Sequence, residues 1–313
     1  MTSDQDPATA RHPKFASAGL FVLVSVLWGV PYLFNDIALQ QIGPLWIAAV
    51  RVAIAGLALG PLLLRDGRWR SIVERWPSLL LLAVVEVALP FTLIAMGQRT
   101  VPSGTTGVLI ALEPIFVALI ALWLTRGRDM TVTGWAGLAV GILGVITLLG
   151  LDLTGPGALL IVAAALSYAI GATSIPHLFP DTDSLTIAAA MILLATPILL
   201  LVALLSEPFV LPSPETWTAL VVLGLACSAA GFTAFFSLIK RATPTTASIT
   251  IYVSPIVSLG AGIVVLGERA TLSEGIGCAL ILIGAALVLR RKATPDLNDD
   301  VAADRAPQRA DQA

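Results

Sequence analysis

The chain has 313 residues, of which 57% are hydrophobic and only 12% are charged, and its formal net charge is −2. This composition is too apolar for a soluble domain, and a near-neutral chain without a basic patch is not expected to bind nucleic acid. The two cysteines, Cys227 and Cys278, lie within apolar runs, so we expect packing residues, with no metal site and no cofactor.

Apolar runs long enough to cross a bilayer follow one another along the chain. The hydrocarbon core requires about 20 consecutive apolar residues per helix, whereas a β-barrel would show shorter alternating segments. The runs therefore predict an all-α membrane protein with ten transmembrane helices. In chain order the predicted helices are 17–34, 43–64, 77–97, 103–124, 133–149, 157–175, 185–204, 217–239, 245–266 and 274–289.

The second five runs repeat the pattern of the first five. Four residues recur with an offset of 140, namely Gly127, Thr131, Gly137 and Gly144, as Gly267, Thr271, Gly277 and Gly284. Because each unit has an odd number of helices, the two units are expected to face opposite ways in the membrane. We predict a disordered tail at 1–15, a first five-helix repeat at 16–150, a second at 157–290, and a disordered tail at 291–313.

The positive charges are distributed unevenly between the two sides of this bundle. Loops on the side of the N-terminus carry thirteen lysines and arginines, while the opposite loops carry only Arg99 and Arg269. Cytoplasmic loops of membrane proteins are enriched in lysine and arginine. We therefore expect a multi-pass protein of the plasma (inner) membrane with both termini in the cytoplasm.

Three short motifs occur in order along the chain: Trp28-Gly29 with Tyr32, Ala-Leu-Glu-Pro at 111–114, and Leu-Gly-Glu-Arg at 266–269. They resemble the first-helix signature, the fourth-helix motif and the turn before the last helix of the EamA-type branch of the drug/metabolite transporter superfamily. The resemblance covers residues 16–290 and implies two inverted EamA repeats and export of a small solute. The first repeat departs from it, because it has Arg128 where the second repeat has Glu268.

Three charged side chains fall near the middle of predicted helices: Arg51, Glu86 and Glu113. A central charge costs about 2.5–3.5 kcal/mol on insertion scales, so such groups normally face the bundle interior and pair. One carboxylate is left over if all three are ionised, and burial of an unpaired carboxylate favours its neutral form. We predict proton coupling through Glu113 and Glu86. The alternative is a fixed Arg–Glu pair that only holds helices together.

Prolines follow polar residues at matching places in the two repeats, as Glu113-Pro114 and Ser254-Pro255. Proline removes one backbone donor and clashes with the preceding turn of a helix. We therefore predict a helix break at Pro114 and another at Pro255, which would expose backbone carbonyls at mid-depth.

Aromatic and hydroxyl side chains recur at helical spacing around these charges. Trp28 and Tyr32, for example, are four residues apart and share a helix face. Such faces would line a cavity, although hydroxyls in membrane helices also bond to neighbouring backbone. The predicted substrate-binding residues are Trp28, Tyr32, Arg51, Glu86, Glu113, Tyr168, Ser228, Phe232, Tyr252 and Ser254.

These features predict a secondary active transporter that works by alternating access and exports an amino-acid-like or cationic solute. Its expected partners are that small molecule, membrane lipids, protons and, through the glycines Gly137 and Gly141, either the other half of the chain or a second copy in a homodimer. A passive channel and a lipid flippase remain alternatives. An enzyme is not expected, because the only histidines, His12 and His177, lie outside the predicted helices and no Walker-type loop occurs.

Overall fold

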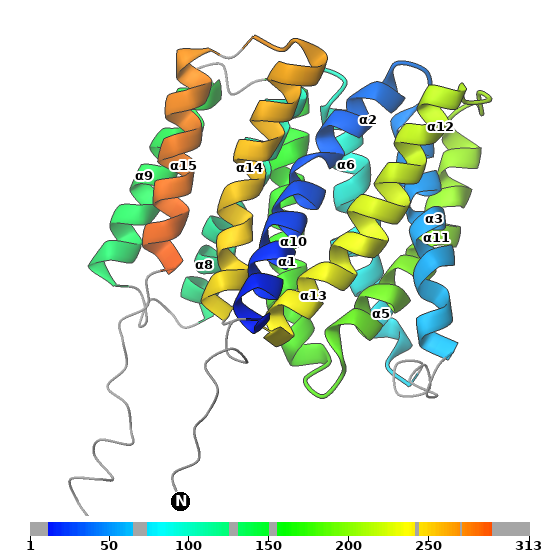
Figure 1. Cartoon of the computed structure of the whole chain (residues 1–313), viewed down its shortest axis with the longest axis horizontal. Helices are drawn as coiled ribbons and strands as arrows, with labels where there is room; N and C mark the ends of the chain where they lie inside the picture. The colour runs from blue at the N-terminus through cyan, green and yellow to red at the C-terminus, as the bar shows by residue number, and fades with distance from the viewer. Residues whose placement is uncertain are drawn as a thin grey trace, which may run out of the picture.

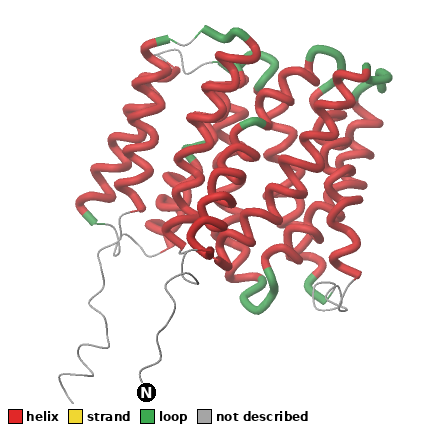
Figure 2. The backbone as a smooth tube through the Cα atoms, viewed as in Figure 1, coloured by secondary structure: helices red, strands yellow, loops and turns green. Residues whose placement is uncertain are grey.

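The computed structural model describes residues 12–64, 74–124, 131–149, 155–241, 244–269 and 271–289. These residues form helices and connecting turns, and no strand occurs among them (Figure 2). The helices stand side by side in one bundle, and the first described helix begins at the same end of the bundle at which the last one ends (Figure 1). The predicted tails lie outside the described residues, except that the first helix begins at His12, within the segment expected to be disordered.

The helical segments follow the ten predicted apolar runs closely. The first half contains α1 (His12–Gly29), α2 (Pro31–Leu39), α3 (Pro44–Leu64), α5 (Trp76–Leu82), the π-helical turn η2 (Ala83–Ala88), α6 (Leu89–Gly97), α7 (Ser103–Ile110), α8 (Glu113–Leu124) and α9 (Val132–Leu149). The second half contains α10 (Pro156–Leu178), α11 (Ser184–Ser206), α12 (Pro214–Val221), the π-helical turn η3 (Val222–Ala230), α13 (Gly231–Arg241), α14 (Pro244–Leu266) and α15 (Leu272–Leu289).

Length and hydropathy identify the segments that can cross a membrane. Within the described residues, seven helical stretches are long and apolar enough to do so. Three shorter apolar helices accompany them, at Val132–Leu148, Thr250–Leu266 and Leu272–Val288. The predicted class, an all-helical multi-span membrane protein, is therefore confirmed.

Two long apolar stretches of the first half, Ala18–Leu39 and Ser103–Leu124, are interrupted near their middle. Val30 separates α1 from α2, whose first residue is Pro31, a position where proline's missing N–H is harmless. Ala111 and Leu112 separate α7 from α8, and their amides donate to the carbonyls of Val108 and Leu109 at 3.2 and 3.1 Å, which tightens the chain just before Glu113. The helix is therefore interrupted immediately before Glu113-Pro114, as we predicted from the proline.

The second proline has a different effect, and the prediction of a break there is wrong. Helix α14 continues through Pro255 without interruption. Because Pro255 has no backbone N–H, it cannot donate to the carbonyl of Ile251 one turn earlier, but the hydroxyl of Ser254 donates to that oxygen at 3.4 Å. A local side-chain donor therefore compensates the lost backbone bond, whereas the first repeat has Glu113 in the equivalent place.

Helices α9 and α15 form a close pair at one edge of the bundle (Figure 1). A β-carbon added at Gly284 would lie 2.5 Å from the backbone nitrogen of Gly141, and one added at Gly144 would lie 2.7 Å from that of Ile281. Only glycine permits this approach of the two backbones. The glycine faces predicted from the repeat therefore join the two halves of one chain.

The hydrophobic cores mix helices from both sequence halves. The larger cluster of buried side chains joins α3 and η2 with α11 and η3, and a second cluster joins α7, α8 and α9 with α10 and α15. The units that pack together in space are therefore not the two repeats of the sequence. The candidate site lies where these units meet.

Candidate functional site

A cavity of about 420 Å³ lies inside the bundle and draws its walls from both halves. Its size is within the range typical of small-molecule sites, about 300–1,000 Å³. Most of the lining side chains are apolar. Eight of the ten predicted binding residues line it: Trp28, Tyr32, Arg51, Glu86, Glu113, Tyr168, Phe232 and Ser254.

Arg51 projects from the middle of α3 and is only 8% exposed. Its Nε donates to Ser228 Oγ at 2.9 Å, and its guanidinium carbon lies 4.1 Å from the centroid of the Phe91 ring. Among the described residues, no carboxylate lies within ion-pair distance of this guanidinium. The fixed Arg–Glu pair considered as an alternative is therefore not formed in this structure.

Glu86 lies in the π-helical turn η2, at the wall that faces α10. Its carboxylate packs against Gly171, where any larger residue would collide with it. The Oε2 atom is buried and has no hydrogen-bond partner among the described residues. π-helical turns often mark functional positions in helices, and a buried carboxyl oxygen without a donor is costly. Glu86 is therefore a group that gains from binding a proton or a cation.

Glu113 is the first residue of α8 and lines the cavity directly after the interruption of the fourth apolar run. Pro114, which follows it, is buried in the first turn. Ile110 and Ala111 complete the same part of the wall.

Two predicted binding residues lie elsewhere. Ser228 is 1% exposed and accepts a hydrogen bond from Arg51 instead of lining the cavity. Tyr252 packs against the second core cluster, and its hydroxyl is buried without a described partner. On α14 the cavity face carries Ile251 and Ser254, which are three residues apart, and Tyr252 is rotated from Ile251 by about 100° around the helix.

An aromatic wall on α13 was only partly predicted. Phe232, Phe235 and Phe236 line the cavity at a spacing of three and four residues. Trp28 of α1 packs on this wall, with its ring centroid 4.4 Å from that of Phe235. The i, i+3, i+4 spacing of these phenylalanines was the available signal, but the same spacing also occurs on lipid-facing helices.

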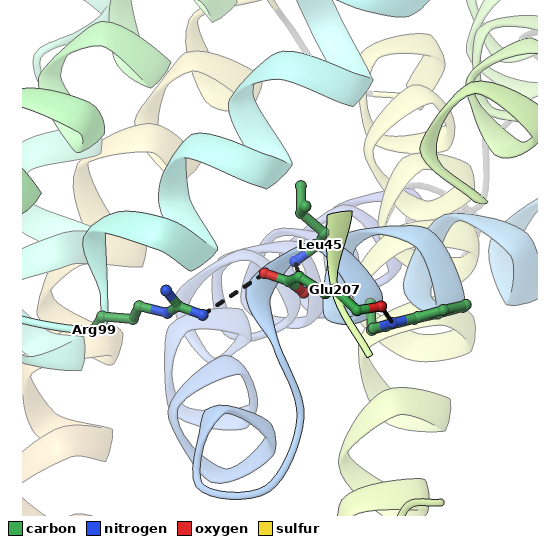
Figure 3. A network of polar contacts seen from close by, with 4 residues as sticks. Leu45, Arg99 and Glu207 are labelled. Atoms are coloured by element: carbon green, nitrogen blue, oxygen red, sulfur yellow. Dashed lines mark hydrogen bonds and ion pairs between the residues drawn. The ribbon is translucent and has the colours of Figure 1, made fainter. Parts of the chain in front are cut away.

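The two ends of the cavity differ. The lining reaches Pro176 and Ser184, where α10 ends and α11 begins, at the end of the bundle that holds the described chain ends (Figure 1). At the opposite end, polar contacts join the two halves. Glu207 accepts from the backbone N–H of Leu45 at 3.1 Å and pairs with Arg99 at 3.6 Å (Figure 3). These contacts tie the first half to the second at this end.

A second carboxylate joins the halves at the same end. Gly267, at a φ of 68°, ends α14 in the left-handed conformation that glycine adopts without strain. The turn brings Glu268 to the N-terminus of α7, where it accepts from Ser103 N at 2.7 Å and from Gly104 N at 3.1 Å. The Leu-Gly-Glu-Arg motif therefore forms an N-terminal helix cap across the repeats.

Comparisons with known proteins agree with this architecture. The model of the EamA-like transporter family matches residues 16–150 and again 155–290. The uncharacterized transporter YvbV of Bacillus subtilis is 27% identical over 285 residues, which cover 88% of this chain and 92% of that protein. The uncharacterized inner membrane transporter YedA of Escherichia coli K12 is 27% identical over 278 residues, covering 86% and 89%.

One similar protein has a more specific name, and one solved structure shares the fold. A probable terminal-alkyne amino-acid exporter of Streptantibioticus cattleyicolor is 28% identical over 278 residues, which cover 86% of this chain and 92% of that protein. A crystal structure matches with a TM-score of 0.62 at 21% identity, over 87% of this chain and 96% of that chain. With a family match over both repeats, the chain belongs to the EamA-like transporter family.

Proposed function

We propose that this membrane transporter is a secondary active exporter of a small amino-acid-like or cationic solute, that it works by alternating access, and that it is coupled to protons. The observation that carries this proposal is the cavity itself: one guanidinium and two carboxylates in a largely apolar chamber whose lining reaches Pro176 and Ser184 at one end of the bundle, while polar contacts between the halves lie at the other end. The amino-acid exporter among the similar proteins supports the solute class.

The chemistry of the cavity fits a solute with an amine. Glu86 and Glu113 are the natural partners of an ammonium group, and the aromatic faces of Trp28 and Phe232 attract cations and apolar groups. A purely anionic solute is disfavoured, because Arg51 is the single cationic side chain that lines the cavity in the described part of the chain.

The orientation in the membrane follows from the charges. We propose that the seven long apolar stretches and the three shorter ones make ten transmembrane helices with both termini in the cytoplasm. Thirteen lysines and arginines on the terminal side, against two on the other, support this orientation. The end of the cavity lined by Pro176 and Ser184 then faces the cytoplasm, where an exporter loads its solute, and the contacts of Glu207 and Glu268 between the halves lie at the outer end.

Proton coupling requires a group that holds either a proton or the solute. Glu86 Oε2 has no donor in the described structure, and Glu113 lies on the same cavity. If the ammonium group of the solute displaces a proton from one of these carboxyl groups, then proton entry on the outer side releases the solute. Because the proton and the solute compete for the same carboxyl group, the movement of one is coupled to the movement of the other.

Transport by purified protein in liposomes tests the proposal. Labelled amino acids and quaternary amines are loaded, and efflux is measured with and without an imposed pH gradient. We expect the gradient to accelerate efflux, and Glu113→Gln to remove that acceleration, while Glu215→Gln on the exposed first turn of α12 preserves it.

Three outcomes would overturn parts of the proposal. If Glu113→Gln responds to the pH gradient like the wild type, the coupling role of Glu113 is wrong. If labelled solute shows no counterflow against unlabelled solute, the protein is a passive channel. If lipid analogues move between leaflets and small solutes do not, it is a flippase.

A further inference from the structure

The guanidinium of Arg51 is held from two directions that together determine its orientation. One is the hydrogen bond from Nε to Ser228 Oγ, at 2.9 Å, and the other is the ring of Phe91, 4.1 Å from the guanidinium carbon. The first comes from η3 of the second half and the second from α6 of the first half. A flexible side chain is thereby fixed in one pose before any solute binds.

The direction of the bond to Ser228 is determined by the π-helical turn. The hydroxyl of Ser228 donates its single proton to the carbonyl of Leu223, at 2.9 Å, within η3. A hydroxyl group has one proton and two acceptor lone pairs, so Ser228 meets Arg51 as an acceptor. Ser228 therefore occupies only the Nε–H of Arg51.

The Phe91 ring that the guanidinium lies over belongs to an aromatic pair that crosses the halves. Phe91 lies edge-on to Tyr168 of α10, with ring centroids 6.5 Å apart and an interplanar angle of 69°. Phe91 is itself buried, which restricts the rotation of its ring away from Arg51. The Nη1 and Nη2 atoms have no partner among the described residues, and Arg51 borders the cavity.

This free edge has the geometry that a carboxylate requires. The two Nη groups point in parallel and match the two oxygens of a carboxylate in a bidentate pair. A guanidinium that is nine-tenths buried and lacks an anion is costly, and a solute carboxylate removes that cost.

We propose that the transported solute carries a carboxylate that binds the Nη edge of Arg51, and that Ser228 and Phe91 are positioning residues that make this carboxylate a condition of recognition. The inference rests on the proposed function and narrows it: an amino acid is accepted, and a simple organic cation or amino-acid amide is rejected. The carboxylates Glu86 and Glu113 take the ammonium end, and the apolar wall takes the side chain.

Matched ligand sets test this inference on the purified full-length protein. Leucine, methionine and phenylalanine are each compared with the primary amide and with the amine that lacks the carboxyl group, by isothermal titration. We expect at least one of the three amino acids to bind at least about tenfold more tightly than its amide and its amine, since a charge-assisted bidentate pair is lost. Arg51→Gln should remove this preference.

The positioning role of Ser228 is tested by the ratio of the affinity for the amino acid to the affinity for its amide. Ser228→Ala should reduce the preference for acid over amide severalfold and leave the affinity for the amine unchanged, and Ser228→Thr, which keeps the hydroxyl, should restore the preference. Ser258→Ala is the matched control, because Ser258 is also buried in the second half and donates to a backbone carbonyl of the first half, that of Ser103, at 3.1 Å.

The possible failures are distinguishable. Equal affinities for acid, amide and amine overturn the carboxylate inference and leave the proposed function standing. A lower thermal stability of Ser228→Ala with an unchanged acid-to-amide ratio overturns the positioning role. Binding of neither amino acids nor amines overturns the proposed function and this inference together.

Discussion

The two repeats of this transporter share their packing and differ in their chemistry. Both halves supply aromatic rings to the cavity, but its charged lining residues, Arg51, Glu86 and Glu113, all come from the first half, whereas the second half contributes the hydroxyls of Ser184 and Ser254. The first half also interrupts its helices at Val30 and before Glu113, while in the second half α14 runs straight through its proline. The comparison teaches that a repeat can keep its fold while only one copy carries the charged groups.

Symmetry persists where backbones must approach closely. Both halves place a π-helical turn in the third apolar run, at η2 and at η3, and both place glycines on the helix that ends the repeat. These features depend on packing, which the pseudo-symmetry imposes on both copies equally. The charged groups have no such constraint, because the cavity needs each of them only once.

The largest effect on stability is expected at the close contact between α9 and α15, where both repeats have glycines. Gly284→Ala would place a methyl group 2.5 Å from the backbone nitrogen of Gly141, so helices α9 and α15 must separate. Overpacking of this kind costs about 1–3 kcal/mol of the free energy of unfolding. Thermal unfolding in detergent would show it. Gly275→Ala in the same helix has open space around it and is the control. Equal melting temperatures of the two variants would contradict the close-packed pair.

An intermediate effect is expected at the turn that follows α14, where the two repeats differ in sequence. Glu268→Ala removes the acceptor of two backbone N–H groups at the start of α7, for which the first repeat has no glutamate in the equivalent place. Loss of a helix cap costs about 0.5–2 kcal/mol, so the midpoint of unfolding should fall accordingly. Glu215→Ala, at the exposed start of α12, should change stability by less than about 0.5 kcal/mol. Similar losses in both variants would show that Glu268 is not a specific cap.

The smallest effect tests why the two prolines differ. Ser254→Ala removes the hydroxyl that donates to the carbonyl of Ile251, to which Pro255 cannot donate a backbone hydrogen bond. A single neutral hydrogen bond contributes about 0.5–1.5 kcal/mol, and the long 3.4 Å contact should fall at the low end. Ser237→Ala is the control: it also removes a hydroxyl that donates to a helix carbonyl, that of Thr233, but α13 contains no proline. If Ser237→Ala is as destabilising as Ser254→Ala, compensation by Ser254 is not the reason that α14 stays continuous.

Helix positions were largely predictable because lipid leaves the backbone few choices. A segment in hydrocarbon must satisfy its own N–H and C=O groups, so an apolar run such as 43–64 becomes a helix, here Pro44–Leu64. Side-chain directions were less predictable. Periodicity identified the polar faces, but Tyr252 and Ser254 are two residues apart and only one of them faces the cavity.

The amino-acid sequence by itself determined the membrane class, the duplicated architecture, the family and the presence of three charged residues within apolar runs, because hydropathy, offset and composition are properties of the linear chain. Only the tertiary structure decided which helices pack together. It also decided that Ser228 accepts a hydrogen bond from Arg51 instead of lining the cavity, and that Glu268 caps the helix at Gly104, 164 residues away in the sequence. These depend on where distant segments meet, and a repeat pattern carries no information on the partner that each helix finds.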